Sequence, residues 1–258
     1  MHAEIIDTAG DGPPLVYVPG IDGSGELLLG TRERLTRRFR LTRLHYVGDP
    51  SGGYPELAAS VVRALDRLAI PRALVLAESF GVAVALETAL DHPTRVAGLA
   101  LVNGFAFYAN RLELALTRSV FALAPEAWIR AGRARFAQRG LFAPRRDEAA
   151  LEALLALRCD WFDELYRARL TCIAGVDLRP RLGEIQCPVA IYAADQDRVV
   201  AAVPAALEMK AAIAGAELEI LAQAGHVVLP LAAEPWPERL ERLAQRCGMT
   251  SAAPRTQR

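Results

Sequence analysis

Residues 73–90 read ALVLAESFGVAVALETAL and combine three local patterns. The apolar run 73–76 predicts a strand, and the apolar run 82–90 predicts a helix that is buried nearly all round. Between them, Ala77-Glu78-Ser79-Phe80-Gly81 predicts a tight turn with the serine at its tip. Such a turn crowds the positions two before and two after the serine, and Ala77 and Gly81 are small enough to stand there. The stretch therefore predicts a strand, a turn and a helix that expose the hydroxyl of Ser79.

Two interpretations of Ser79 are open at this point. The pattern matches a nucleophile elbow, with alanine in place of the usual first glycine. A serine at the start of a buried helix is also a common N-cap. Because a serine hydroxyl becomes nucleophilic only when a base takes its proton and a third group orients that base, the other loops decide between the two interpretations.

The composition of the chain narrows the classes of protein to consider. Its 258 residues suit one large domain, or a domain with an insertion, and 52% of them are apolar, enough for a sizeable core. Thirty basic and thirty acidic residues balance, which argues against a nucleic acid or an anionic membrane surface as partner. No apolar stretch reaches the length of a membrane span.

The cysteines and the N-terminal residues bear on the compartment. The four cysteines are scattered without a CxxC pair or a metal-ligand spacing, which predicts free thiols and no metal. The first residues lack the charged-then-apolar pattern of a secretory signal. We therefore expect a cytoplasmic protein.

Short apolar runs alternate with longer helical patterns along most of the chain. Runs without strict alternation are typical of parallel strands covered on both faces, and their alternation with helices predicts an α/β doubly wound, mostly parallel sheet. We expect the run 41–47, which is mixed in polarity, to be a more exposed strand. The predicted helices are 55–69 and 80–90, and the predicted strands are 15–18, 41–47, 73–77, 96–102, 189–193 and 218–221.

This alternation stops between residues 105 and 181. Helical patterns at 112–123, 126–138 and 147–170 replace it, without a strong strand run. We predict a helical lid inserted at 105–181, within a core made of 1–104 and 182–248. The polar tail 249–258 is predicted to be disordered.

A base for Ser79 is sought among four histidines. His45 ends a strand and His92 ends a helix, and both are interpreted as structural residues. His226 follows Ala224-Gly225 directly after the last predicted strand, where glycine permits a close turn. His226 is therefore the candidate base.

Two aspartates compete for the role of the acid. Asp195 and Asp197 both follow the predicted strand 189–193. We prefer Asp197, because a loop must extend away from its strand before it turns into a helix. Asp195 would then shape or cap the turn, and capping of the next helix is the structural alternative for the pair. The resulting order is Ser79, Asp197, His226.

With these residues in place, the chain resembles the α/β-hydrolase fold proteins over residues 3–247, which share the order serine, acid, histidine. Residues 18–25, VPGIDGSG, together with the AESFG turn, are similar to a subset that has a P-G-x-D-G-[ST]-G loop. That subset includes bacterial esterase-like hydrolases and plant plastid proteins that transfer fatty acyl groups to phytol and diacylglycerol. Two departures tighten the elbow, alanine at 77 and valine at 82, and Pro19-Gly20 replaces the common His-Gly.

The resemblance implies an oxyanion hole made by the backbone N–H groups of Ile21 and Phe80. Such donors stabilise the charge that develops when a nucleophile attacks an ester carbonyl. The glycine order of the loop does not suit a dinucleotide site, which is the other use of a glycine-rich turn.

The predicted activity is that of a serine esterase or lipase-like enzyme acting on a small-molecule ester, without cofactor or metal. Aromatic residues of the lid suggest an apolar pocket for the acyl group, with Phe105, Phe107, Trp128 and Trp161 as candidate substrate contacts. The alternatives are an acyltransferase that uses the same acyl-enzyme, a lyase or C–C hydrolase on this fold, and a non-catalytic ligand-binding protein of the same fold. The sequence indicates no oligomeric state.

Overall fold

Seven strands form one sheet in the computed structural model, which describes residues 1–124, 128, 132, 135, 137–142, 144, 147–157 and 164–249. The strand order is β1-β3-β2-β4-β5-β6-β7, with β1 antiparallel to β3 and the other neighbours parallel. The strands are β1 (His2–Ala9), β2 (Pro14–Val18), β3 (Arg40–Val47), β4 (Ala73–Glu78), β5 (Val96–Val102), β6 (Val189–Ala194) and β7 (Glu217–Leu221).

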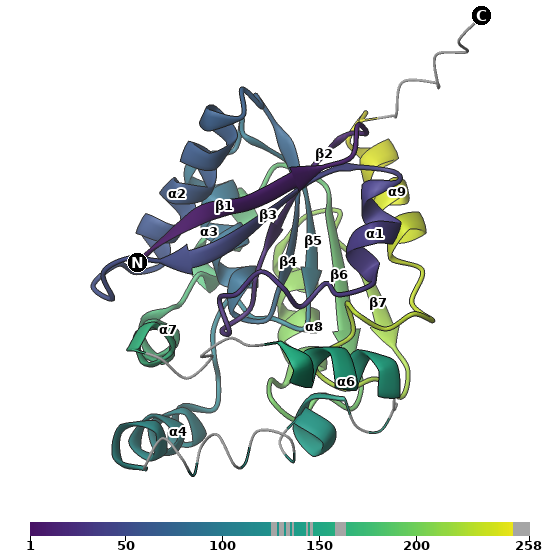
Figure 1. Ribbon diagram of the computed structural model, residues 1–258. Coiled ribbons are helices and arrows are strands. Elements are labelled where there is room, and N and C mark those ends of the chain that lie inside the picture. Colours follow the sequence, from purple (N-terminus) through teal and green to yellow (C-terminus); the bar gives the residue numbers. More distant parts are fainter. Residues whose placement is uncertain are drawn as a thin grey trace, which may run out of the picture.

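Helices cover both faces of this sheet (Figure 1). Alternate residues of β2 point to opposite faces, so that Val16 and Val18 join one apolar core and Leu15 and Tyr17 the other. The first core includes α2 (Tyr54–Arg67), α3 (Phe80–Asp91) and α8 (Ala202–Ala212). The second includes α1 (Thr31–Thr36) and α9 (Trp236–Arg246). The expectation of a doubly wound α/β sheet is thus confirmed.

The segment between β5 and β6 contributes further helices beyond one end of the sheet (Figure 1). Its elements are α4 (Arg111–Leu123), a π-helical turn (Ala137–Leu141), α6 (Glu148–Ala156), α7 (Glu164–Gly175) and a 3₁₀ turn (Arg179–Glu184). The helix expected over 147–170 is in fact two, because α6 ends at Ala156 and α7 begins at Glu164. Most of the helix expected over 126–138, and residues 250–258 of the tail, lie outside the described residues.

The expectation of an exposed strand at 41–47 is wrong. Leu41, Thr42 and Leu44 are at most 1% exposed. Leu41 belongs to the second apolar core and Leu44 to the first, and β1 pairs along the outer edge of β3. Arg43 is buried as well, since its guanidinium is neutralised by Asp7 and Glu26. The sequence analysis did not predict β1, and the edge of the sheet lies at that strand instead.

The described cysteines form no disulfide bond. Cys172, Cys187 and Cys247 are free thiols, as expected, while Cys159 lies outside the described residues. Within the described part of the chain, no helix combines the length and apolar character that a bilayer crossing requires.

Candidate active site

Ser79 occupies a strained turn between β4 and α3. Its φ of 52° and ψ of −120° lie in a region that non-glycine residues rarely adopt, and its side chain is buried. A Cβ at position 81 would lie 2.4 Å from the carbonyl oxygen of Pro19, so glycine is required there. The turn thus forces the serine into a fixed position at the carboxyl end of β4.

The two departures from the usual elbow are accommodated by neighbouring residues. Ala77 is fully buried within β4, where its small side chain fits. Val82 is opposite Gly104, and a Cβ at position 104 would lie only 2.3 Å from the Cβ of Val82. The side chain of Val82 therefore fits because position 104 has no side chain.

The structure brings Ser79, His226 and Asp197 together. Nε2 of His226 lies 3.0 Å from Oγ of Ser79, and Nδ1 lies 2.7 Å from Oδ2 of Asp197. The other carboxylate oxygen, Oδ1, accepts hydrogen bonds from the N–H groups of Val199 (2.8 Å) and Val200 (3.0 Å). Because both oxygens of Asp197 are engaged, its orientation toward the imidazole is fixed.

Asp195 has a different partner. Its Oδ1 accepts a hydrogen bond of 3.2 Å from the N–H of Ala224, two residues before His226. It therefore ties the loop after β6 to the loop after β7, while Asp197 is the aspartate that contacts the imidazole.

The environment of His226 favours its protonated form. Burial opposes the charge, but the Asp197 carboxylate outweighs burial through its charge and its hydrogen bond, and raises the pKa of His226 above 6.5. The carboxyl group of Glu78 acts in the same direction. A raised pKa and a contact with Oγ of Ser79 are the properties that a general base for this serine would need.

Asn103 connects the loops that carry the acid and the base. This buried residue directly follows β5, and its Nδ2 donates to the carbonyl oxygens of His226 (2.7 Å) and Gly225 (3.3 Å). Its Oδ1 accepts from the N–H of Ala194 at 2.7 Å, at the end of β6. Its φ of 45° is one that asparagine tolerates better than most residues.

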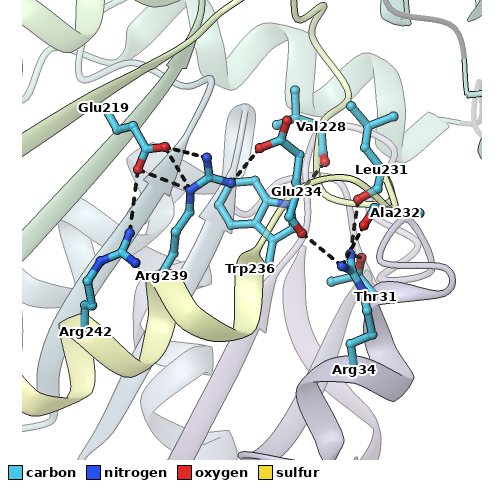
Figure 2. Close-up of polar contacts among 10 residues, drawn as sticks. All are labelled: Thr31, Arg34, Glu219, Val228, Leu231, Ala232, Glu234, Trp236, Arg239 and Arg242. Carbon is cyan, nitrogen blue, oxygen red and sulfur yellow. Dashed lines mark hydrogen bonds and ion pairs between the residues drawn. The ribbon is translucent and has the colours of Figure 1, made fainter.

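The segment that follows His226 is anchored at several further points (Figure 2). Arg34 of α1 donates to the carbonyl oxygens of Leu231 (3.1 Å), Ala232 (3.0 Å) and Glu234 (2.9 Å). Nε1 of Trp236 donates to the carbonyl oxygen of Val228 at 3.2 Å. These contacts attach the segment to α1 and α9.

A buried arginine adds a second anchor to the same segment. Arg239 of α9 lies between the carboxylates of Glu234 (2.6 Å) and Glu219 of β7 (Figure 2). Its guanidinium carbon also lies 4.9 Å from the ring centre of Trp236. The backbone beyond His226 is therefore held from both α9 and β7.

The loop between β2 and α1 lies against the serine. Within the described residues, neither the N–H of Ile21 nor that of Phe80 donates a hydrogen bond. A Cβ at position 20 would lie 3.5 Å from the Cβ of Ser79, which shows how closely the loop passes. The N–H groups of Ile21 and Phe80 directly follow these two residues, and because neither has a partner in the described part of the chain they are suited to bind a developing oxyanion.

A buried carboxyl group lies directly before Ser79. Glu78 accepts a hydrogen bond from the hydroxyl of Tyr17, and both side chains are buried. Burial, together with the charge of Asp22, raises the pKa of Glu78 to about 7, although the Tyr17 hydrogen bond opposes the shift. The carboxyl is thus partly protonated at neutral pH.

A largely apolar cavity of about 570 Å³ opens above Ser79. Phe105 and Trp128 line it, although the side chain of Trp128 is 74% exposed. The other lining residues are also mostly apolar and include Ile21, Leu114, Phe121, Leu170 and Ile173.

The other two aromatic candidates are placed differently. Phe107 lines a neighbouring cavity of about 490 Å³, and the guanidinium carbons of Arg179 and Arg111 lie 3.6 Å and 4.8 Å from its ring centre. Trp161 lies outside the described residues.

The sequence analysis missed three groups near this site. Asn103 could have been noticed, because an Asn-Gly pair follows an apolar strand run. The Tyr17–Glu78 pair and Arg169, which contacts the loop at 20–22, gave no local signal, because each depends on segments far apart in the chain.

With this geometry established, a family model described as "Alpha/beta hydrolase family" matches residues 15–242. The chain belongs to the alpha/beta hydrolase family. Among the relatives, the proposed carbamate hydrolase RutD of Klebsiella pneumoniae is 27% identical over 225 residues, which are 83% of this chain and 84% of the relative. RutD of Escherichia coli O157:H7 is 25% identical over 229 residues, 84% of this chain and 85% of the relative.

Solved structures show the same fold. The enol-lactonase of Burkholderia xenovorans LB400 superimposes with a TM-score of 0.81 at 19% identity, over 94% of this chain and 96% of the other. The esterase EaEST of Exiguobacterium antarcticum has a TM-score of 0.80 at 19% identity, over 94% of this chain and 95% of the other. At this identity the likeness establishes the alpha/beta hydrolase fold.

Proposed function

We propose that the protein is a serine hydrolase that cleaves a carboxylic ester of a mostly apolar acyl group through an acyl-enzyme. The observation that carries the proposal is the continuous hydrogen-bonded chain from Ser79 through His226 to Asp197. Membership of a hydrolase family and the hydrolase names of the relatives support the reaction class.

The proposed reaction starts with attack of Ser79 Oγ on the ester carbonyl while His226 takes the hydroxyl proton. Asp197 holds the imidazole in the tautomer that presents Nε2 as the acceptor, and it stabilises the imidazolium. The N–H groups of Ile21 and Phe80 bind the oxyanion. His226 then gives its proton to the leaving alcohol, and afterwards activates water to release the acid.

The lining of the cavity supports an apolar acyl group. Transfer of alkyl groups from water into such a lining is favourable by about 0.8 kcal/mol per buried CH₂. We propose that the helical segment 105–181 acts as a lid, because Phe105, Leu114, Phe121 and Leu170 all come from it. A cytoplasmic location remains part of the proposal.

The test is replacement of the proposed nucleophile. Ser79→Ala should lower turnover of a short acyl ester by about 10⁴-fold or more, because it removes the attacking atom. Ser60→Ala, at another buried serine, should keep turnover within a few-fold of wild type. Near-normal turnover by Ser79→Ala would contradict the assignment.

Chemical labelling extends the same test to specificity. A fluorophosphonate should label Ser79 and leave the Ser79→Ala variant unlabelled. Turnover of esters with increasing acyl length should rise and then fall as the chain outgrows the cavity. Stoichiometric labelling without turnover on any ester would favour a ligand-binding protein instead.

A carbamate is the second candidate substrate class, because the RutD relatives carry that name. The same attack on a carbamate carbonyl would use the same residues. Comparison of kcat/KM for a matched ester and carbamate separates the two. Addition of an alcohol acceptor, followed by measurement of how product divides between acid and new ester, separates hydrolysis from acyl transfer.

A further inference from the structure

Arg169 of α7 reaches from the helical segment to the loop beside Ser79. Its side chain is 2% exposed. Nε donates to the carbonyl oxygen of Ile21 at 2.6 Å, and Nη2 donates to the carbonyl oxygen of Asp22 at 3.2 Å. One guanidinium group thus holds two consecutive carbonyl groups of the loop that carries the Ile21 N–H.

The loop is shaped around this guanidinium. A Cβ at position 23 would lie 2.9 Å from Cζ and 2.9 Å from Nη1 of Arg169. Gly23 also has a φ of +68°, which favours glycine. The absence of a side chain at position 23 therefore makes room for Arg169.

Tyr46 of β3 holds the same loop from the core. Its hydroxyl donates to the carbonyl oxygen of Pro19 at 2.9 Å, and its N–H donates to the carbonyl oxygen of Gly23 at 2.9 Å. These bonds fix the two ends of the turn. Three peptide groups lie between them, and Arg169 holds the two on the carbonyl side of Ile21 and Asp22.

The Ile21 N–H belongs to the Gly20–Ile21 peptide, whose carbonyl oxygen accepts a hydrogen bond of 3.1 Å from the N–H of Gly23. That N–H belongs in turn to the Asp22–Gly23 peptide, whose carbonyl group Arg169 holds. The direction of the Ile21 N–H therefore depends on Arg169 through this hydrogen bond. An oxyanion donor is effective when it is fixed before charge develops, because reorientation during the reaction costs free energy. The guanidinium suits this task, since its planar fork can hold two carbonyl oxygens at once.

We propose that Arg169 is a positioning residue that holds the Ile21 N–H in place for the oxyanion. The inserted helical segment is thereby a part of the catalytic apparatus as well as a cover. The inference rests on the proposed function, and it assigns a role to a residue outside the triad.

The experiment compares Arg169→Met with Arg95→Met. Arg95 is a matched control, because its Nε and Nη2 also donate to two consecutive carbonyl oxygens, those of Pro71 (2.8 Å) and Ile70 (3.1 Å). Arg95 directly precedes β5, and Ile70 and Pro71 lie shortly before β4, so the contact is at the amino ends of these strands, whereas Ser79 follows the carboxyl end of β4. Both variants lose an arginine that bridges two backbone carbonyl groups. Only Arg169→Met removes such an arginine next to the candidate oxyanion hole.

The expected result is specific to the transition state. Arg169→Met should lower kcat by about 10- to 100-fold with KM changed less than about threefold, because one oxyanion donor is worth about 10²–10³-fold. Affinity for an alkyl boronate, which forms a tetrahedral adduct with Ser79, should fall by a similar factor. Affinity for the carboxylate product, which is planar, should stay within about threefold, and Arg95→Met should keep all three values.

Arg169→Lys keeps the positive charge but lacks the planar guanidinium that holds two carbonyl oxygens. Its kcat and boronate affinity should therefore lie between those of wild type and Arg169→Met. It also carries the test if Arg169→Met does not fold. Unchanged boronate affinity in either variant, or equal losses for boronate and carboxylate product, would overturn the positioning role. Retention of ester hydrolysis by Ser79→Ala would instead overturn the proposed function itself.

Discussion

At the scale of single residues, the choice between Asp195 and Asp197 illustrates how position determines role. The two aspartates lie in one loop, yet Asp197 contacts His226 and Asp195 contacts the backbone of Ala224. Sequence reasoning could favour Asp197 from the reach of the loop. Only coordinates could show that its two oxygens are divided between the imidazole and the N–H groups of Val199 and Val200.

Replacement of Asp197 should therefore alter both the rate and its pH dependence. Asp197→Asn should lower kcat by about 10⁴-fold, because an amide favours the wrong imidazole tautomer. The base must be neutral, so wild-type kcat/KM should fall as pH drops through the raised pKa of His226, above 6.5. Loss of the carboxylate charge lowers that pKa, so the acid limb should move to lower pH.

The measurement is a pH profile of kcat/KM from pH 4.5 to 9 with an activated ester. Asp195→Asn serves as the control and should keep both the rate, within a few-fold, and the acid limb of wild type. An acid limb at the same pH in Asp197→Asn and wild type would contradict the assignment of the base.

At the scale of elements, the candidate site depends on how the ends of β4, β5, β6 and β7 are joined. Ser79 follows β4, and the loops after β6 and β7 carry Asp197 and His226. Asn103, after β5, bonds to the end of β6 and to the backbone of His226. One buried amide thus links the segments that carry Asp197 and His226 without touching either side chain.

Substitution of Asn103 should weaken both the fold and the catalytic geometry. Asn103→Asp keeps an acceptor for the N–H of Ala194, but it presents oxygen to the carbonyls of Gly225 and His226. Loss of these buried bonds should cost about 1–3 kcal/mol in the free energy of unfolding and should also lower kcat. Urea unfolding and steady-state kinetics measure the two effects.

A stability control separates these effects. Ser60 of α2 is buried and accepts a hydrogen bond of 2.7 Å from the N–H of Ala3, so Ser60→Ala should also destabilise the protein. Its kcat should match wild type, because α2 does not carry a candidate catalytic residue. A full kcat in Asn103→Asp would show that the bridge is purely structural.

At the scale of the whole molecule, the buried carboxyl of Glu78 links global stability to pH. Its pKa in the fold, about 7, exceeds its ordinary value of 4.5. The folded state therefore binds this proton more tightly than the unfolded state does. Stability falls as pH rises from about 4.5 to 7, by up to about 3 kcal/mol at 1.36 kcal/mol per pKa unit.

Glu78→Gln should remove this dependence, because the amide does not ionise. The stability of the variant relative to wild type should therefore be greater at pH 8 than at pH 5, by up to about 3 kcal/mol in the free energy of unfolding. Urea unfolding of both proteins at the two pH values gives the difference. A constant difference between the two curves would contradict the raised pKa of Glu78.

Much of the sheet could be predicted from the sequence, because parallel strands that are buried on both faces leave apolar runs. The runs at 73–77 and 96–102 match β4 and β5 closely. The antiparallel strand β1 has no comparable run, since its residues HAEIIDTA mix polar and apolar types. The wrong expectation of exposure at 41–47 came from the mixed polarity of that run, because the sequence does not show that Arg43 is paired with Asp7 and Glu26.

The elbow, the class of the fold and the order of the candidate catalytic residues could all be predicted from the amino-acid sequence. Those features depend on residue type and local spacing, which the printed chain contains. The folded structure was needed to show which aspartate contacts His226, how Gly104 makes room for Val82, and which arginine donates to the carbonyl oxygen of Ile21. Such contacts depend on distances between segments far apart in the chain, and local spacing carries no record of them.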